Sequence, residues 1–178
     1  MLDLRRSTGP VLTIAPDSWM RPLLVEDVGS DYIDALNNET VSKFLVSAKS
    51  GRYTVENVRA MVRENFESAD SMLFGIFCDS THCGNVRLHD IAGRRAYLGI
   101  AIFDLKRQAR GLGVKAINAV TDYAIVELGI DTILAGIDDR NIPSVRAFTK
   151  AGFKEVDASG QDSGQLWKFE RITRASAS

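Results

Sequence analysis

Apolar residues recur along the chain with two different spacings, and each spacing predicts a different kind of element. Over residues 54–66 they stand three or four positions apart, which predicts a helix with one apolar face. Residues 113–128 show the same spacing and predict the strongest helix of the chain. Residues 72–78 and 95–103 are instead nearly continuous apolar runs, which are typical of strands.

The remaining elements are shorter. Strands are predicted at 19–24, 84–88, 132–137 and 166–172, and helices at 26–36 and 143–150. The order is therefore strand, two helices, a meander of three strands, and then helix, strand, helix, strand, which indicates a mixed α/β (α+β) fold. We expect one domain over residues 19–173, an N-terminal extension over 1–18 and a C-terminal tail over 174–178. Residues 1–16 are expected to be loosely held.

Composition narrows the class of protein and of partner. The 178 residues are 45% hydrophobic and 25% charged, which fits one globular domain. A net charge of −1 gives no basic field for a polyanion, so we expect no nucleic-acid partner. No apolar run approaches the roughly 20 residues of a membrane helix, and the N-terminus lacks the apolar stretch of a secretory signal. We therefore expect a cytoplasmic protein without membrane contact.

Cysteine and histidine residues lie close together in the middle of the chain, at Cys78, His82, Cys83 and His89. Their spacing matches no standard zinc pattern, so we expect no metal. Two cysteines do not make a disulfide framework in a chain of this length. His89 is a candidate general base, since an imidazole has an ordinary pKa near ~6.5, or else it is part of a surface turn.

The stretch richest in chemistry lies between the longest strand and the strongest helix. It reads Arg107-Gln108-Ala109-Arg110-Gly111-Leu112-Gly113-Val114. The glycines allow a tight turn and expose consecutive N–H groups at a helix N-terminus, which carries partial positive charge. Arg107 and Arg110 add full charges, so the stretch predicts a phosphate or pyrophosphate site. The competing interpretation is a glycine-containing loop with solvated arginines.

A second motif runs from Asn141 to Phe153, NIPSVRAFTKAGF, and combines a polar turn, a short helix with proline in its first turn and a glycine stop. In this order the two motifs resemble the GNAT superfamily of N-acetyltransferases. The first is similar to the acetyl-CoA loop Q/R-x-x-G-x-G/A, and the second to N-x-x-S/A-x-x-x-aromatic-x-K-x-G-F. Arg21-Pro22-Leu23 followed by Glu26-Asp27 resembles the opening of the ribosomal-protein N-terminal acetyltransferase branch. The resemblance covers residues 19–172.

The resemblance implies a GNAT-like fold, with a central, mostly antiparallel, twisted sheet splayed between two parallel strands and helices on both faces. It implies acetyl-CoA (coenzyme A) as cofactor and acetyl transfer to a primary amine, such as a peptide α-amine, an amino sugar or another small amine. Direct attack in a ternary complex is the expected mechanism, and the protein is expected to be a monomer or homodimer.

Site residues follow from the same resemblance. Backbone groups of Ile102 and Phe103 are expected to bind the pantetheine arm and stabilise the oxyanion. The pyrophosphate is assigned to Arg107, Gln108, Ala109, Arg110, Gly111, Leu112, Gly113 and Val114. The thioester end is assigned to Asn141, Ser144 and Phe148. The acceptor region is assigned to Glu39, His89 and Tyr97, with a solvated position as the competing interpretation of Glu39.

Two positions depart from the family pattern. Many relatives carry a tyrosine where Phe148 stands, and its hydroxyl protonates the departing thiolate; Ser144 is the nearest hydroxyl here, and it either replaces that acid or only caps the helix. Relatives often carry a glutamate base where Tyr97 stands, so Tyr97 either lines the acceptor pocket or packs in the sheet. Without an evident carboxylate, the site favours an amine of low pKa, such as an α-amine near ~8, over a lysine near ~10.4.

Two alternatives to catalysis by this family remain open. Gly111-Leu112-Gly113-Val114-Lys115-Ala116 also fits the dinucleotide-binding pattern G-x-G-x-x-A of an oxidoreductase. Too little chain follows it for the repeated halves of that fold, and five residues separate it from the strand. The second alternative is a non-catalytic acyl-CoA-binding relative that has lost its acid and base.

Overall fold

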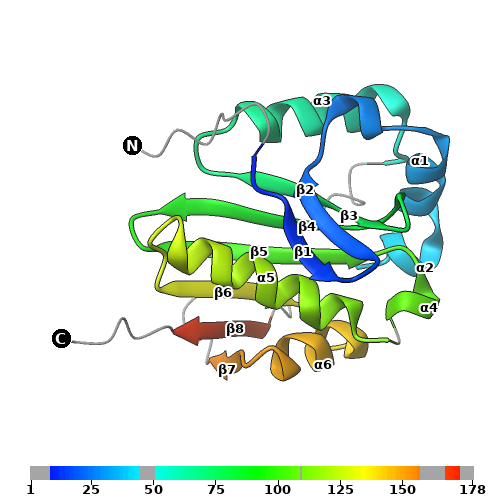
Figure 1. The fold of residues 1–178 in the computed structure, drawn as a ribbon. Coiled ribbons are helices and arrows are strands. Elements are labelled where there is room, and N and C mark those ends of the chain that lie inside the picture. Colours follow the sequence, from blue (N-terminus) through cyan, green and yellow to red (C-terminus); the bar gives the residue numbers. More distant parts are fainter. Residues whose placement is uncertain (1–8, 45–50, 109, 157–166, 173–178) are drawn as a thin grey trace.

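The computed structural model describes residues 9–44, 51–108, 110–156 and 167–172. The strands are β1 (Leu12–Ala15), β2 (Ser18–Pro22), β3 (Met72–Cys78), β4 (Thr81–Ala92), β5 (Arg95–Ile102), β6 (Thr132–Ile137), β7 (Lys154–Val156) and β8 (Trp167–Ile172). The helices are α1 (Ser30–Asn37), α2 (Glu39–Ser42), α3 (Val55–Glu67), α4 (Leu105–Gln108), α5 (Leu112–Val126) and α6 (Ile142–Lys150), with a 3-10 turn η1 (Val25–Asp27). The predicted α/β class and element order are confirmed (Figure 1).

The structure differs from the prediction most at two strands, β1 and β4, and it adds three short elements that were not predicted, α2, α4 and β7. Residues Leu12–Ala15, expected to be loosely held, form β1, because Leu12 and Ile14 pack against the core and the strand pairs with β2. Strand β4 continues past residue 88, so His89 lies in the sheet, opposite Tyr97, and not in a surface turn.

The sheet has the strand order β1-β2-β3-β4-β5-β6-β8-β7 and is antiparallel except where β5 pairs with β6. That parallel pairing includes only three residue pairs, and it ends at Tyr97 opposite Leu134. Strand β5 continues to Ile102 and β6 to Ile137, but the two strands do not pair with each other beyond this point and therefore splay apart. The predicted splay is thus confirmed, and a mostly antiparallel sheet is incompatible with the doubly wound fold of a dinucleotide-binding enzyme.

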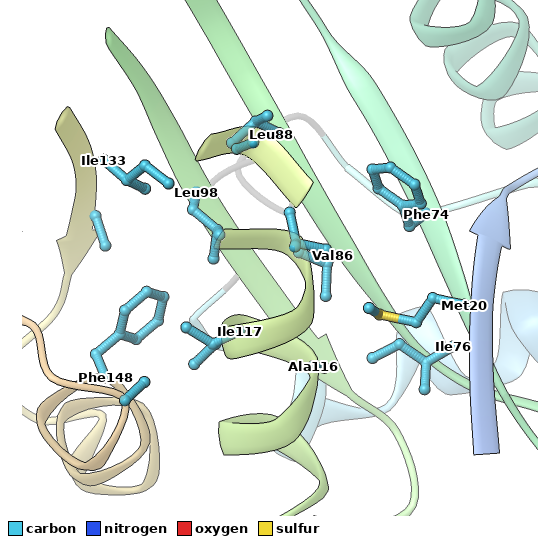
Figure 2. Packing of buried hydrophobic residues seen from close by; sticks show 14 of the residues in the cluster. Met20, Phe74, Ile76, Val86, Leu88, Leu98, Ala116, Ile117, Ile133 and Phe148 are labelled. Atoms are coloured by element: carbon cyan, nitrogen blue, oxygen red, sulfur yellow. The ribbon is translucent and has the colours of Figure 1, made fainter. Parts of the chain in front are cut away.

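Alternation of side chains along the strands divides the core into two layers. On one face, Val86 of β4 and Leu98 of β5 pack against Ile117 of α5 and Phe148 of α6 (Figure 2). On the other face, α1 and α3 cover β3 through a second cluster that includes Leu73. The helices therefore lie on both faces of the sheet, as the family resemblance implies (Figure 1).

The opening segment that resembles one branch of the family has a structural role. Arg21 donates two hydrogen bonds of 2.7 Å to the carboxylate of Asp27, which also accepts the N–H of Leu24 at 2.8 Å. Burial raises the pKa of Asp27, but these bonds outweigh it and hold that pKa below its usual range. The pair fixes the turn η1 that leads from β2 into α1.

Cys78 and Cys83 are paired as a disulfide across the turn between β3 and β4. The antiparallel register of the two strands brings their Cα atoms to 6.3 Å. The sequence analysis expected no disulfide framework and did not predict this local pair. Among the described residues, no group of three or more His, Cys, Asp or Glu side chains is placed to hold a metal ion.

Candidate active site

A cavity of about 870 Å³ lies at the splay between β5 and β6. It is lined by Ile100, Ala101 and Ile102 of β5, by Leu105 and Gln108 of α4, by Arg110, Gly111, Gly113 and Val114 at the start of α5, by Arg140, Asn141, Ile142, Pro143, Ser144, Arg146, Ala147 and Lys150 in and before α6, and by Thr40, Val41, Lys43 and Phe44 in and after α2. Segments far apart in the sequence therefore meet around one space. Most of the sequence-predicted cofactor residues are among them.

The N-terminus of α5 opens into this cavity. Gly111 is the N-cap, with a left-handed φ of +80° that favours glycine. The first bond of the helix is donated by Lys115 to the carbonyl of Gly111, at 3.2 Å. Helix geometry therefore leaves the N–H groups of Leu112, Gly113 and Val114 without an intrahelical acceptor, and together with the helix dipole they form an anion site.

The predicted run of donors is shorter than the sequence suggested. The N–H groups of Gln108, Arg110 and Gly111 donate to the carbonyls of Asp104, Arg107 and Gln108, at 2.9, 3.1 and 3.2 Å. These three N–H groups are therefore already bonded within the turn that leads into α5. Ala109 lies outside the described residues. The donors left for a ligand are those of the first helical turn.

Arg107 is not directed at this anion site, which corrects the expectation from the sequence. Its guanidinium contacts Asp79 at 2.6 Å, Asp17 at 3.0 Å and Asp104 at 3.4 Å. It lines a separate hollow of about 350 Å³. Hydrogen bonds from Ser18 and Arg107 hold the pKa of Asp17 below its usual range. Arg107 thus ties α4, directly before the anion site, to the β1–β2 and β3–β4 turns.

Arg107→Gln is expected to raise the KM for acetyl-CoA about fivefold and to leave kcat nearly unchanged, because the variant loosens the turn before α5 without removing a group from the cavity. Steady-state kinetics with varied acetyl-CoA measure both constants. Arg94→Gln is a matched control, since it breaks the exposed ion pair with Asp131 at 2.6 Å, away from the cavity. An unchanged KM in Arg107→Gln would contradict the positioning role.

The open edge of β5 is defined by the direction of its backbone groups. The N–H of Phe103 donates to the carbonyl of Cys83, at 2.8 Å, and therefore points toward β4. Because backbone groups of a strand alternate in direction, those of Ile100 and Ile102 point to the opposite edge, beyond the last parallel pair of Tyr97 and Leu134, where β6 has diverged. The prediction for Ile102 agrees with this geometry. For Phe103, the N–H is not available to a ligand, because it is already bonded within the sheet.

The ring of Phe103 also points away from the cavity. It packs on Tyr32 and on His82, with ring centroids 5.4 and 5.5 Å away. His82 Nε2 lies 2.7 Å from Oδ1 of Asn85, whose side-chain amide donates to the hydroxyl of Tyr32. Burial lowers the pKa of His82, so its ring is neutral at pH 7. This buried group was not predicted from the sequence, because its members come from separate elements.

Helix α6 presents two different sides. Asn141 is its N-cap, and its side-chain oxygen accepts the N–H of Ser144 at 3.3 Å. Both residues line the cavity. Phe148, expected near the sulfur, is only 2% exposed and packs edge-on against Phe153 at 5.0 Å. Its ring belongs to the core and not to the cavity lining, which corrects that expectation (Figure 2).

The predicted acceptor residues lie at the end of the splay and near α2. Tyr97 is half-buried at the last paired position of β5, and its ring stacks on that of His89 at 5.8 Å. His89 Nδ1 lies 3.0 Å from a carboxylate oxygen of Asp90. Tyr97, His89 and Asp90 are not among the cavity-lining residues. Glu39 is exposed, and the following residue, Thr40, is the one that lines the cavity.

Sequence reasoning missed most of the positive charge around the cavity. Its lining includes Lys43, Arg110, Arg140, Arg146 and Lys150, and none of its described members is an Asp, Glu or His. Arg146 and Lys150 stand four positions apart on α6, and this helical spacing is the signal that predicts a shared face. The cavity therefore suits a polyanionic ligand.

Comparisons with known proteins agree with this geometry. The model of the acetyltransferase (GNAT) domain family matches residues 19–154. A Bacillus subtilis (strain 168) protein named "Probable N-acetyltransferase YjcK" is 32% identical over 144 residues, which cover 76% of this chain and 79% of that protein.

Solved structures share the fold at low identity. RimL, a ribosomal L7/L12 alpha-N-protein acetyltransferase solved with coenzyme A, superposes with a TM-score of 0.80 at 16% identity, over 92% of this chain and 98% of that one. Spermidine N-acetyltransferase from Vibrio cholerae, solved with CoA and spermine, gives a TM-score of 0.73 at 17% identity, over 89% and 96%. In the part of this chain that the structure describes, no helix has the length and apolar character needed to cross a membrane.

Proposed function

The chain belongs to the GNAT family of acetyltransferases, and on that premise we propose that it transfers an acetyl group from acetyl-CoA to a primary amine by direct attack in a ternary complex. The observation that carries the proposal is the cavity at the splay, which joins the N-terminus of α5 to the open edge of β5. One end offers donors for a pyrophosphate, and the other offers backbone groups for the amides of pantetheine. One continuous cavity therefore offers binding groups for the pyrophosphate and for the pantetheine arm of CoA.

The cofactor residues follow from the directions of these groups. The N–H groups of Leu112, Gly113 and Val114 hold the pyrophosphate, and Arg110, Arg146 and Lys150 compensate the remaining phosphate charge. The edge groups of Ile100 and Ile102 bind the pantetheine arm as a neighbouring strand would. One of these N–H groups stabilises the developing oxyanion.

The chemical step then needs little beyond positioning. The nitrogen of the neutral amine attacks the thioester carbonyl carbon, and the C–S bond breaks. The departing thiolate takes a proton from the Ser144 hydroxyl, which regains one from water, and the amide nitrogen loses its extra proton to solvent. Because no described residue lining the cavity is a carboxylate or a histidine, the acceptor has to arrive largely neutral. An α-amine of pKa ~8 meets that condition far better than a lysine amine of ~10.4.

Relatives do not fix the acceptor, since one structural neighbour acts on spermidine and another on a ribosomal-protein α-amine. A panel of peptides, amino sugars, aminoglycosides and polyamines, with CoA release as the readout, identifies the class. The absence of a carboxylate or histidine among the described cavity-lining residues favours one second candidate, a relative that binds acyl-CoA without catalysis. That candidate predicts binding without turnover on the whole panel.

Calorimetry tests the cofactor directly. We expect acetyl-CoA to bind with a Kd in the micromolar range, about −8 kcal/mol, because a pyrophosphate and a pantetheine arm are both bound. NAD is the matched control, since it carries a pyrophosphate but no pantetheine. Tight NAD binding without acetyl-CoA binding would overturn the proposal.

A further inference from the structure

Part of the sheet face that carries α1 and α3 is not covered by any described residue beside the splay. Gly99 of β5 lies on this face, between Tyr97 and Ala101, because side chains alternate along a strand. Among the described residues, no heavy atom lies within 4 Å of the position that a Cβ on Gly99 would occupy. Ala101, two residues on, lines the cavity. The space over Gly99 therefore adjoins the cavity on this face.

Arg87 stands beside this space. It pairs with Gly99 across β4 and β5, and its side chain is exposed. Its Nε donates to the hydroxyl of Ser71 at 3.1 Å, and among the described residues no carboxylate forms an ion pair with it. The four N–H donors of its two terminal amino groups remain, in a fixed fork, for another partner.

The charged side chains on this part of the sheet face are mainly positive. Between Asn85 and His89 of β4 and between Arg95 and Ala101 of β5, the residues on this face are Asn85, Arg87, His89, Arg95, Tyr97, Gly99 and Ala101, which include two arginines and no carboxylate. The neighbouring carboxylate of Asp90 is engaged by His89 at 3.0 Å. Lys43 adds a further cation at the α2 side of the cavity. A polycation that approaches this face meets like charge.

We propose that the acceptor carries an anionic group, a carboxylate or a phosphate, beside its primary amine, and that Arg87 binds this group over Gly99. The inference rests on the proposed acetyl transfer and names its substrate class. A planar guanidinium forms bidentate hydrogen bonds with either anion, which orients the amine toward the thioester. Polyamines, which lack an anion, are poor acceptors.

Matched acceptors test the inference. The tripeptide amides Ser-Glu-Ala, Ser-Ala-Ala and Ser-Lys-Ala differ only in charge next to the α-amine, glucosamine 6-phosphate and glucosamine differ only in the phosphate, and spermidine represents polycations. We expect kcat/KM to fall about tenfold from the acidic to the neutral peptide, the scale of one charge-assisted contact, and further for the basic peptide. The peptide and sugar arms separate a carboxylate from a phosphate source.

Arg87→Glu is expected to reverse the peptide order and to leave the KM for acetyl-CoA unchanged. Arg63→Glu makes the same change of net charge at an exposed position of α3, and it should preserve the wild-type order. Gly99→Val fills the open space and should raise the acceptor KM for every acceptor. Circular dichroism confirms that each variant is folded.

An unchanged order in folded Arg87→Glu, or spermidine as the best acceptor, overturns the inference and leaves the proposed transfer standing. If acetyl-CoA binds but no acceptor turns over, the proposed function fails instead. Calorimetric binding of the three peptides to the CoA-loaded protein then decides the inference by itself, because it does not depend on turnover. Equal peptide affinities overturn it, and an acidic preference that Arg87→Glu reverses supports it.

Discussion

Gly111→Val is expected to raise the KM for acetyl-CoA by about 100-fold, equivalent to about 2.7 kcal/mol of binding. Gly111 has a φ of +80°, where a β-branched residue is strained, so the turn that presents the first N–H groups of α5 has to change. Among the described residues, nothing lies within 4 Å of the added Cβ, so the side chain also occupies open space at the anion site. Steady-state kinetics measure the effect.

The same substitution at a second glycine separates strain from ligand contact. Gly129 has a φ of +66° and follows the other end of α5, away from the cavity lining. Gly129→Val should therefore cost about 1–2 kcal/mol of unfolding free energy, as Gly111→Val does, and leave the KM unchanged. If both variants, folded by circular dichroism, keep a normal KM, the start of α5 is not the anchor of the cofactor.

The sequence was most informative where function depends on local backbone geometry. Gly111 and the N-cap Asn141 are encoded by short motifs, because a left-handed turn and a helix cap each need only a few adjacent residues. The element order also followed from apolar spacing within each segment. Residues of both motifs line the same cavity, as their local geometry leads one to expect.

Sequence reasoning failed where a residue's role is set by a distant partner. Arg107 was assigned to the phosphate, yet its guanidinium is bound by Asp17 and Asp79, which lie 90 and 28 positions away. Phe103 was assigned to the pantetheine arm, yet the antiparallel register directs its N–H toward the carbonyl of Cys83. Neither register nor an ion pair between turns leaves a periodic signal in the chain. Arg146 is the opposite case, because its four-residue spacing from Lys150 on α6 is a local signal that predicts one shared face, and both residues line the cavity.

Ser144→Ala is expected to lower kcat by about 100-fold, the scale of one acid–base contribution. Ser144 lines the cavity in the first turn of α6, where Asn141 accepts its backbone N–H and fixes its position. The KM for acetyl-CoA should change little, because the hydroxyl acts only as the thiolate departs. Thr149→Ala is the matched control: it removes an exposed hydroxyl of the same helix, bonded at 2.8 Å to the carbonyl of Val145, and should leave kcat unchanged.

Phe148→Tyr distinguishes two sources of a proton on α6, the Ser144 hydroxyl and a phenol at position 148. The Phe148 ring is packed between the helix and the sheet, so a phenol placed there meets the core rather than the cavity. We therefore expect that adding Phe148→Tyr does not raise the lowered kcat of Ser144→Ala, and that it costs about 1–3 kcal/mol of stability, as an unpaired buried hydroxyl does. If Ser144→Ala instead retains normal turnover, the thiolate takes its proton from water. The rate then comes from the positions of the amine and the thioester in the splay, which alone provide a large effective concentration.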